Sequence, residues 1–325
     1  MKKSHPSYDI IGDIHGHADP LRALLAKLGY EERRGAYRHP ERQAIFVGDF
    51  VDRGPKIRET LQIVRAMVDG GSALAVLGNH EWNALRYHTL GADGQPLRAN
   101  SAKYTAQHQA TLDQVALPFP DEWQDWLAWF KTLPLFLDLG QLRVVHASWC
   151  ARSVAEVGNR RFADDDVLHA TSRSNLIRYD AVKTLLTGPE LDLPDGARFQ
   201  DKNGHEHRNI RVRWFRDGKR AEAATYRSLV FPPSGDVPAL AVPPELLTSV
   251  PDYAENEPPV IFGHYWMPPG TPQRLAKNAA CVDYSVALKT GGFLTAYRWS
   301  GEREVEDERF VTVATNENEI RRASE

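Results

Sequence analysis

Short apolar runs recur along the chain, separated by polar or amphipathic stretches. The runs predict short strands, and their lack of polar alternation indicates a sheet that is covered on both faces. Because helical patterns separate the early strands, we expect a parallel sheet of the α/β class. The predicted strands cover residues 8–11, 44–47, 73–77, 143–146, 260–262, 281–284 and 293–299.

Three segments carry apolar residues at spacings of three and four, which is the period of a helix with one buried face. The first predicted helix has Asp19 as its N-cap and Pro20 at its first position, and it ends at Gly29. The second begins at Pro55 and ends at the pair Gly70-Gly71. We interpret the tryptophans of the third as core residues. The apolar face of the first helix consists of Leu21, Leu24, Leu25 and Leu28, that of the second of Ile57, Leu61, Val64 and Val68, and that of the third of Trp123, Trp126, Leu127 and Phe130.

The regular pattern breaks down between residues 151 and 258, and apolar strands resume afterwards. We therefore predict a single domain over residues 1–310, in which 151–258 is an insertion between late core strands that could shape the substrate site. Residues 311–325 are predicted to be a polar tail. Within the insertion, Asn203-Gly204 and Asp217-Gly218 are turn signals.

A basic stretch interleaved with aromatic residues lies inside the insertion. Such a stretch is typical of a surface that binds nucleotides or single strands. The same alternation also fits a β-hairpin with one solvated face, which we favour because the whole chain is acidic. The stretch contains Arg208, Arg211, Arg213, Trp214, Phe215, Arg216, Lys219 and Arg220.

Composition narrows the class of protein without indicating its activity. The chain has 325 residues, a formal net charge of −3 and 42% hydrophobic residues, which is ordinary for a globular protein. Nothing in this balance favours nucleic acid or an anionic membrane as a partner. The only cysteines, Cys150 and Cys281, provide no disulfide framework, and no apolar run is long enough to span a membrane. We therefore expect a cytoplasmic protein.

Polar side chains follow five of the predicted strands. Ligands of open α/β sheets collect at the carboxyl ends of the strands, so these side chains should meet at one edge. Mixed carboxylate, imidazole and amide groups suit two divalent cations of intermediate softness, and a carboxylate between them could bridge both. Two such ions stabilise the attacking and leaving oxygens of an in-line displacement, which points to phosphate esters. The positions are Asp13, His15, Asp49, Asn79, His80, His146 and His264.

The motifs GDIHGH, GDFVDRGP, GNHE, VVHA and FGH occur in this order and resemble the signature of calcineurin-like metallophosphoesterases. The resemblance is to the phosphoprotein-phosphatase branch, with bacterial serine/threonine phosphatase and diadenosine tetraphosphatase relatives. It implies a four-layer α/β/β/α sandwich and a dinuclear metal centre whose bridging hydroxide hydrolyses phosphate monoesters. Mn²⁺ is the first choice of metal, and Fe²⁺, Zn²⁺ or Ni²⁺ are alternatives.

The resemblance also implies a role for each matched residue. His80 would protonate the leaving group, Asp52 would orient His80, and Arg53 and Asn79 would bind the substrate phosphate. One metal would be held by Asp13, His15 and Asp49, and the other by Asp49, Asn79, His146 and His264. The second phosphate-binding arginine of the family stays open between Arg160, Arg161, Arg173 and Arg178.

Several departures from the family pattern narrow the branch. Trp266 stands where phosphodiesterases carry a second metal-binding histidine, and Leu77 stands where eukaryotic protein phosphatases carry arginine. Asp52-Arg53 and Glu81 differ from the pattern of the symmetrical tetraphosphatases. These features favour a bacterial phosphatase that acts on a phosphoprotein or on a small phosphoester or nucleotide.

Two other functions stay open. One is hydrolysis of dinucleoside polyphosphates or of RNA 5′ ends. The other is a non-catalytic scaffold, which is disfavoured because the metal-ligand positions and the acid position His80 are all retained.

Overall fold

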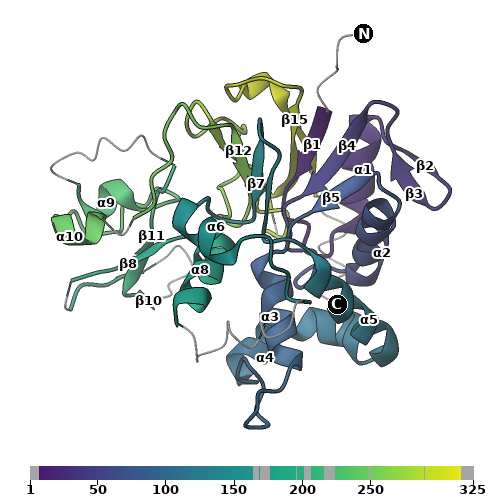
Figure 1. Cartoon of the computed structure of the whole chain (residues 1–325), viewed down its shortest axis with the longest axis horizontal. Coiled ribbons are helices and arrows are strands. Elements are labelled where there is room, and N and C mark those ends of the chain that lie inside the picture. The colour runs from purple at the N-terminus through teal and green to yellow at the C-terminus, as the bar shows by residue number, and fades with distance from the viewer. Residues whose placement is uncertain are drawn as a thin grey trace.

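The computed structural model describes residues 7–163, 168, 176–194, 196–200, 206–215, 224–248, 250–288 and 290–315 (Figure 1). One sheet of the fold is built around β1, which runs parallel to β4 and antiparallel to β15. β5 extends the sheet beside β4, while β14 and β16 both pair with β15. The strands are β1 (Ser7–Ile11), β4 (Arg42–Phe46), β5 (Ala73–Ala75), β14 (Asp283–Tyr284), β15 (Phe293–Trp299) and β16 (Phe310–Ala314).

A second sheet of four strands has the order β13-β12-β7-β6. Its central strand β12 is parallel to both neighbours, and β6 is antiparallel to β7. The strands are β6 (Phe136–Asp138), β7 (Arg143–Val145), β12 (Val260–Phe262) and β13 (Ala279–Cys281). The predicted strand at 281–284 is thus two strands in different sheets, separated by Val282.

Side chains alternate between two apolar layers along these strands. Ile10 and Ile45 belong to one cluster with Val144 and Ile261 of the other sheet, so the two sheets pack face to face. Ile11 points away from this layer and belongs to the larger cluster that includes the helices. Both faces of each sheet are therefore covered, which confirms the predicted α/β/β/α sandwich.

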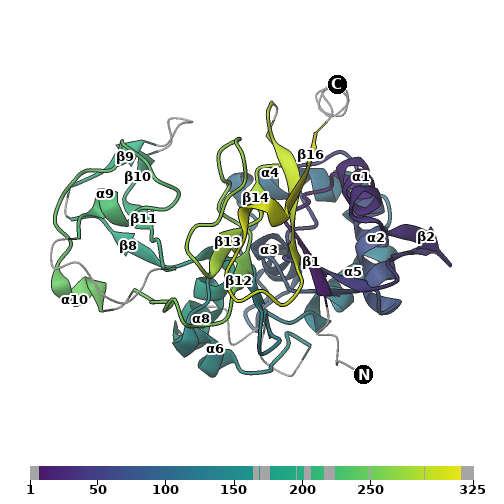
Figure 2. The same cartoon turned by 90° about the horizontal axis from the view of Figure 1, so that it is seen from above.

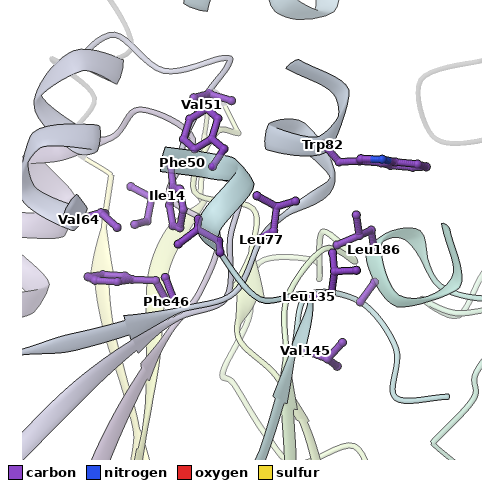
Figure 3. Close-up of a cluster of buried hydrophobic side chains, with 14 of the residues drawn as sticks. Ile14, Phe46, Phe50, Val51, Val64, Leu77, Trp82, Leu135, Val145 and Leu186 are labelled. Carbon is purple, nitrogen blue, oxygen red and sulfur yellow. The ribbon is translucent and has the colours of Figure 1, made fainter. Parts of the chain in front are cut away.

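Helices cover the outer faces of both sheets (Figure 1). Figure 3 shows Phe46 beside Val64 of α2, and Val145 of the second sheet beside Leu135 and Leu186. The helices around the core are α1 (Ala18–Leu28), α2 (Ile57–Asp69), α3 (Asn79–His88), α4 (Ala102–Thr111), α5 (Pro120–Thr132), α6 (Ala151–Val157) and α8 (Leu176–Thr187), and a π-helical segment (Leu112–Ala116) links α4 to α5. None of the helices in the described part of the chain is long and apolar enough to cross a membrane.

The start of the first helix differs from the prediction. α1 begins at Ala18, and Asp19 is not its N-cap but lies in its first turn. The Asp19 carboxylate binds Arg22 at 2.9 Å and Lys56 at 2.5 Å, so a tertiary ion pair takes the place of the predicted cap. The end at Gly29 is confirmed, with the left-handed backbone that glycine favours. α2 likewise begins at Ile57, two residues after the predicted Pro55.

The predicted tail begins too early in the chain. Phe310–Ala314 form β16, which pairs with β15 over five residues. Val311 and Val313 pack on the main cluster and Phe310 on the layer between the sheets, so the segment has the two-residue period of a strand. Residues 316–325 lie outside the described residues.

The predicted insertion divides into two parts, because α6 and α8 pack on the core whereas the later elements form an apolar cluster of their own to one side of it (Figure 2). The later elements are β8 (Glu190–Asp192), β9 (Phe199–Gln200), β10 (Glu206–His207), β11 (Asn209–Arg211), α9 (Tyr226–Leu229) and α10 (Pro244–Leu247). A further hairpin, β2 (Glu31–Arg33) and β3 (Ala36–Arg38), and a 3-10 turn at Asp307–Arg309 complete the described elements. The division into one domain with an insertion stays a prediction.

The basic and aromatic stretch of the insertion does not keep the predicted alternation. Trp214 and Phe215 are consecutive and both buried, because their rings pack on Phe262 at centroid distances of 5.0 and 5.5 Å. Arg211 and Arg213 are exposed. Both predicted turns, and Arg216, Lys219 and Arg220, lie outside the described residues.

Candidate metal centre and active site

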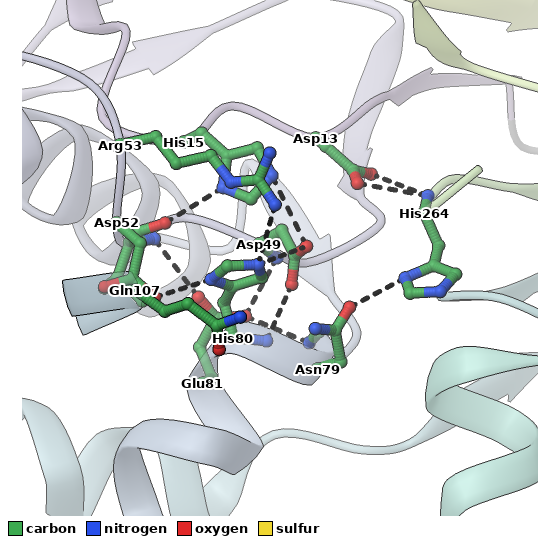
Figure 4. Close-up of polar contacts among 12 residues, drawn as sticks. Asp13, His15, Asp49, Asp52, Arg53, Asn79, His80, Glu81, Gln107 and His264 are labelled. Carbon is green, nitrogen blue, oxygen red and sulfur yellow. Dashed lines mark hydrogen bonds and ion pairs between the residues drawn. The ribbon is translucent and has the colours of Figure 1, made fainter. Parts of the chain in front are cut away.

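The loops that follow β1, β4, β5, β7 and β12 meet at one end of the two sheets (Figure 4). Parallel strands place their carboxyl ends at the same edge, which explains the convergence. Each of the predicted site residues lies in these loops or at the first turn of the helix that follows. They are Asp13, His15, Asp49, Asp52, Arg53, Asn79, His80, His146 and His264.

Six of these loop positions have a left-handed backbone although they are not glycine. Such a conformation costs of the order of 1–3 kcal/mol per residue and persists only where the surroundings enforce it. Among the described residues with positive φ, these six lie in the site loops: His15, Asp49, Asp52, Arg53, His264 and Trp266. These backbone conformations lower the stability of the fold, and they orient the side chains of the site.

Gly48 and Gly78 allow the second and third loops to touch. A Cβ on Gly48 would lie 2.4 Å from the backbone nitrogen of Gly78, and a Cβ on Gly78 would lie 2.2 Å from Oδ1 of Asp49. Only glycine at both positions permits this approach. It brings Asp49 next to Asn79 and to the first turn of α3.

Glu81 anchors the loop that carries Asp49. Its carboxylate accepts the backbone N–H groups of Asp49, Phe50, Val51 and Gly78 at 2.8–3.2 Å. Burial, and next the charge of Asp49, raise the pKa of Glu81 to about 7, whereas the four donors favour its ionised form. Glu81 is fully buried and fixes the conformation of the loop without reaching the site surface.

One group of potential metal ligands consists of His15, Asp49 and His80, whose ligand atoms all lie within 4.8 Å of one another. Nδ1 of His15 donates to the carbonyl oxygen of Val51 at 3.0 Å, which leaves Nε2 with a lone pair. That Nε2 is buried, has no hydrogen-bond partner among the described residues, and lies 3.5 Å from Oδ2 of Asp49. A buried acceptor aimed at a carboxylate is the arrangement that a cation between them would satisfy.

The second group joins Asp49 to His146 and His264. His146 donates from Nδ1 to the carbonyl oxygen of Val47 at 2.8 Å, so its Nε2 also carries a lone pair. This Nε2 lies 2.9 Å from Oδ1 of Asn79 and 3.5 Å from Oδ1 of Asp49. His264 faces the same Asn79 oxygen at 2.7 Å, and its Nε2 is buried without a partner in the described chain. Acceptor atoms thus converge here too.

Asp13 lies in the site but in neither of these groups. Its carboxylate accepts the backbone N–H of His264 at 3.0 Å, as Figure 4 shows. Burial, followed by the charges of Asp283 and Asp49, raises the pKa of Asp13 well above its usual range. The assignment of Asp13 to the first metal stays a prediction.

The charges of the site fit divalent cations. Asp13, Asp49 and Asp283 are buried. Besides burial, the charges of Asp283 and Asp49 raise the pKa of Asp13, and the charge of Asp49 raises the pKa of Asp283. Clustered buried carboxylates are unfavourable unless positive charge compensates them. Burial raises the pKa of Asp49, but positive charge on the rings of His146, His80 and His15 and the backbone N–H of His80 outweigh it and lower the pKa to about 2, so the carboxylate is ionised where positive charge surrounds it. Ionised carboxylate, imidazole lone pairs and an amide oxygen form a donor set for metals such as Mn²⁺, Fe²⁺ and Zn²⁺.

His80 and Asp52 form a hydrogen-bonded pair beside the metal-ligand groups. Nδ1 of His80 lies 2.5 Å from Oδ2 of Asp52, and Nε2 lies 3.3 Å from Nη2 of Arg53. Burial lowers the pKa of His80, but the charge of Asp49 and the bond to Asp52 outweigh it, so the pKa is raised. The Arg53 guanidinium stacks on Trp266, 3.9 Å from the ring centroid.

Two residues of α4 that the sequence analysis missed hold Asp52. Its Oδ1 accepts from Nδ1 of His108 at 2.7 Å and from Oγ1 of Thr111 at 2.6 Å. Neither residue belongs to a recognised motif, and α4 lies 50 to 60 residues further along the chain. No signal in the sequence pointed to them.

Of the candidates for a second phosphate-binding arginine, two contact α6. Arg160 donates to the carbonyl oxygens of Glu156 and Val157, and Arg178 pairs with Glu156 at 3.7 Å. Arg173 lies outside the described residues. The charge of Arg211, which belongs to the insertion, is second only to burial in lowering the pKa of His264.

Comparison with known proteins shows the family of this chain. The family model described as calcineurin-like phosphoesterase matches residues 7–222, about two thirds of the chain and the loops after β1, β4, β5 and β7. The chain belongs to the calcineurin-like phosphoesterase family. The predicted membership is thereby confirmed, and the predicted ligand positions in those loops fall within the matched segment.

Relatives named as asymmetrical bis(5′-nucleosyl)-tetraphosphatases PrpE match parts of the chain. The protein from Halalkalibacterium halodurans is 49% identical over 81 residues, which is 25% of this chain and 33% of that protein. The protein from Bacillus subtilis is 33% identical over 161 residues, or 47% of this chain and 62% of that protein. The matches therefore cover less than two thirds of the length of these relatives.

Solved structures with a similar arrangement include a serine/threonine phosphatase from Saccharomyces cerevisiae. It is 14% identical, with a TM-score of 0.48, over 96% of this chain and 80% of that one.

Proposed function

We propose that this protein hydrolyses phosphate monoesters in a reaction that depends on two divalent metal ions. The observation that carries the proposal is the set of buried acceptor atoms around Asp49. Nε2 of His15 and Nε2 of His264 have no hydrogen-bond partner among the described residues, and Nε2 of His146 faces the oxygens of Asn79 and Asp49. Leaving buried acceptors without donors costs about 1–3 kcal/mol each, so a fold that keeps them has a use for them.

In this proposal, Asp49 is shared between the two metal sites. Asp13 and His15 complete one site, and Asn79, His146 and His264 complete the other. When bound, the two cations would stabilise the attacking and leaving oxygens and acidify a water molecule. Mn²⁺ is the first metal to test, followed by Fe²⁺, Zn²⁺ and Ni²⁺.

His80 acts in the proposal as the general acid that protonates the departing oxygen. Its Nδ1 is engaged by Asp52, so Nε2 is the ring atom that can pass a proton to a leaving group. The side chain of Asp52 is 4% exposed and that of His80 is 12% exposed, so this pair is more open to solvent at His80. This leaves Nε2 facing the position of the substrate.

Arg53 and Asn79 bind the transferred phosphoryl group in the proposal. The planar guanidinium of Arg53 is exposed and can donate two parallel hydrogen bonds to phosphoryl oxygens. Arg211, which belongs to the insertion, is our candidate for the second phosphate-binding arginine, because its charge acts on His264 of the second metal group. The insertion would then contribute to substrate binding.

A second candidate function is hydrolysis of dinucleoside polyphosphates. The relatives from Halalkalibacterium halodurans and Bacillus subtilis carry the name bis(5′-nucleosyl)-tetraphosphatase, and their matches favour it. The same acid and metal ligands would serve, with a nucleotide as the leaving group. Steady-state rates of the Mn²⁺-loaded protein on diadenosine tetraphosphate and on a phosphoserine peptide decide between the two candidates, because the higher specificity constant identifies the better substrate.

The leaving-group dependence of His80→Ala tests the proposed chemistry. An alkyl phosphate releases a poor leaving group and needs the acid, whereas nitrophenolate departs without help. General acid catalysis contributes about 10²–10⁴-fold, so His80→Ala should lose a factor of that order on the alkyl ester and far less on the nitrophenyl ester.

Metal content, measured in the same samples, is the control for this experiment, because His80 also lies within reach of the first metal group. Equal losses on both esters with unchanged metal content would show that His80 is not the acid.

A further inference from the structure

Asp52 makes more hydrogen bonds than its partnership with His80 requires. One carboxylate oxygen, Oδ2, accepts from His80, and the other, Oδ1, accepts from both His108 and Thr111 at 2.7 and 2.6 Å. Burial raises the pKa of Asp52, but the hydrogen bonds from His108 and His80 outweigh it and lower the pKa well below its usual range. The carboxylate is therefore ionised, and each oxygen has a fixed set of donors.

Thr111 constrains Asp52 at two points with a single hydroxyl group. Its Oγ1 accepts the backbone N–H of Asp52 at 2.9 Å and donates its only proton to Oδ1 of the same residue. Asp52 has a left-handed backbone, with φ of 67°, a conformation that is uncommon for residues other than glycine. The threonine thus fixes both the backbone and the side-chain rotamer.

His108 completes a chain of hydrogen bonds that all point towards Asp52. Its Nδ1 donates to Asp52, so its Nε2 is an acceptor and faces Nε2 of His88 at 3.2 Å. Burial lowers the pKa of His88 to about 4, so the neutral ring of His88 can donate from Nε2 to Nε2 of His108. The rings of both histidines pack against Trp123, at 5.3 and 5.9 Å, which restrains their orientation.

The two anchors come from one face of α4, because positions 108 and 111 are three residues apart. α4 belongs to the helical layer, and its anchors are 4% and 0% exposed. Oδ2 of Asp52 pairs with His80, whereas Oδ1 pairs with His108 and Thr111. The two anchors of α4 therefore contact the carboxylate oxygen that does not contact His80.

We propose that Thr111 and His108 are positioning residues that fix the carboxylate of Asp52 so that Oδ2 orients His80 for proton transfer to the leaving group. The proposal rests on the proposed role of His80 as general acid. A residue with this role should affect only substrates that need the acid, whereas a purely structural residue should affect all substrates alike.

The pair Thr111→Val and Thr111→Ser tests the proposal. Valine keeps the shape and removes both hydrogen bonds, while serine keeps the hydroxyl. With Thr111→Val, kcat on an alkyl phosphate should fall about tenfold, a part of the 10²–10⁴-fold that acid catalysis contributes. KM and the rate on a nitrophenyl phosphate should change less than about twofold, and Thr111→Ser should restore the rate.

Thr60→Val is the matched control. Thr60 is a fully buried threonine of α2 whose Oγ1 has no hydrogen-bond partner among the described residues. Its substitution should leave the ratio of the two rates unchanged. His108→Asn, which keeps an N–H donor near the place of Nδ1, and His108→Leu, which removes it, repeat the test if Thr111→Val does not fold.

A spectroscopic readout accompanies the rates. Nitrogen chemical shifts of ¹⁵N-histidine-labelled protein report the tautomer of each ring, and in the wild type both His80 and His108 should carry the proton on Nδ1. In Thr111→Val, the His80 resonance should shift or broaden.

The outcomes separate this proposal from the one on which it rests. Suppose that the loss in His80→Ala depends on the leaving group. If Thr111→Val then slows both esters equally, or slows neither ester, the positioning role is wrong and the acid role stands. If His80→Ala itself shows no such dependence, both fall together.

Discussion

Arg53 and Trp266 form a stacked pair at the solvent-accessible side of the site. Both residues have a left-handed backbone, with φ of 72° and 51°, and the backbone N–H of Trp266 donates to Asp283 at 2.7 Å. Trp266 stands where the related phosphodiesterase pattern has a metal-binding histidine. In this chain its ring stacks on the guanidinium of Arg53 instead, and so supports the residue that we propose to bind the phosphate.

The stacked pair leads to a prediction for Trp266→Leu. Cation–π contacts contribute about 0.5–2 kcal/mol, so loss of the ring should raise KM about 2- to 30-fold. Alkyl and nitrophenyl phosphates should be affected to a similar degree, because Arg53 is proposed to bind the phosphoryl group and not the leaving group. Steady-state kinetics on both esters measure this effect, and Trp266→Phe, which keeps an aromatic face, should lie in between. An unchanged KM in Trp266→Leu would contradict the role of the ring.

At the scale of elements, the first turn of α3 organises the loop after β4. Glu81 receives three successive backbone N–H groups of that loop, and the N–H of His80 donates to Asp49 at 2.9 Å. The positive end of the helix therefore faces the carboxylate that is proposed to bridge the metals. A helix terminus and a buried carboxylate thus fix the same loop from two sides.

Glu81→Gln should destabilise the protein. A glutamine places an NH₂ group where one carboxylate oxygen of Glu81 accepts backbone N–H groups. At least one buried N–H then has no acceptor, which costs about 1–3 kcal/mol for each such group. The hydrogen bonds that remain are weaker, because their acceptor is a neutral amide oxygen and no longer a carboxylate. We expect the free energy of unfolding in urea to fall by about 2–4 kcal/mol. Glu59→Gln is the control, because the surface pair of Glu59 with Arg22 contributes less than about 1 kcal/mol. Equal stability of Glu81→Gln and wild type would refute the anchoring role.

The elements also show what the sequence could predict. Strands and the residues after them were predictable, because short apolar runs and the motif order both depend on local sequence. Thr111 and His108 were not, since their contacts with Asp52 span 59 and 56 residues and carry no periodic signal. The strand at Phe310–Ala314 was missed because its charged surroundings concealed a short alternation of apolar residues. Asp19 looked like a cap, but a distant lysine competes for its carboxylate.

At the scale of the whole molecule, the packing of two sheets explains how distant segments form one site. The first three loops come from the sheet around β1, and those with His146 and His264 come from the other sheet. The insertion is joined to this arrangement by aromatic packing, since the ring of Phe231 lies 4.8 Å from that of Tyr265, next to His264. Changes in the insertion can therefore reach the loop that carries a proposed metal ligand.

The central claim is that hydrolysis requires two metal ions held around Asp49. The most direct measurement is a Mn²⁺ titration of protein from which metal has been removed by a chelator and whose metal content has been verified by mass spectrometry. We predict no hydrolysis of nitrophenyl phosphate in the stripped protein, and recovery that saturates at two Mn²⁺ per chain. Full activity in the verified metal-free protein would contradict the account.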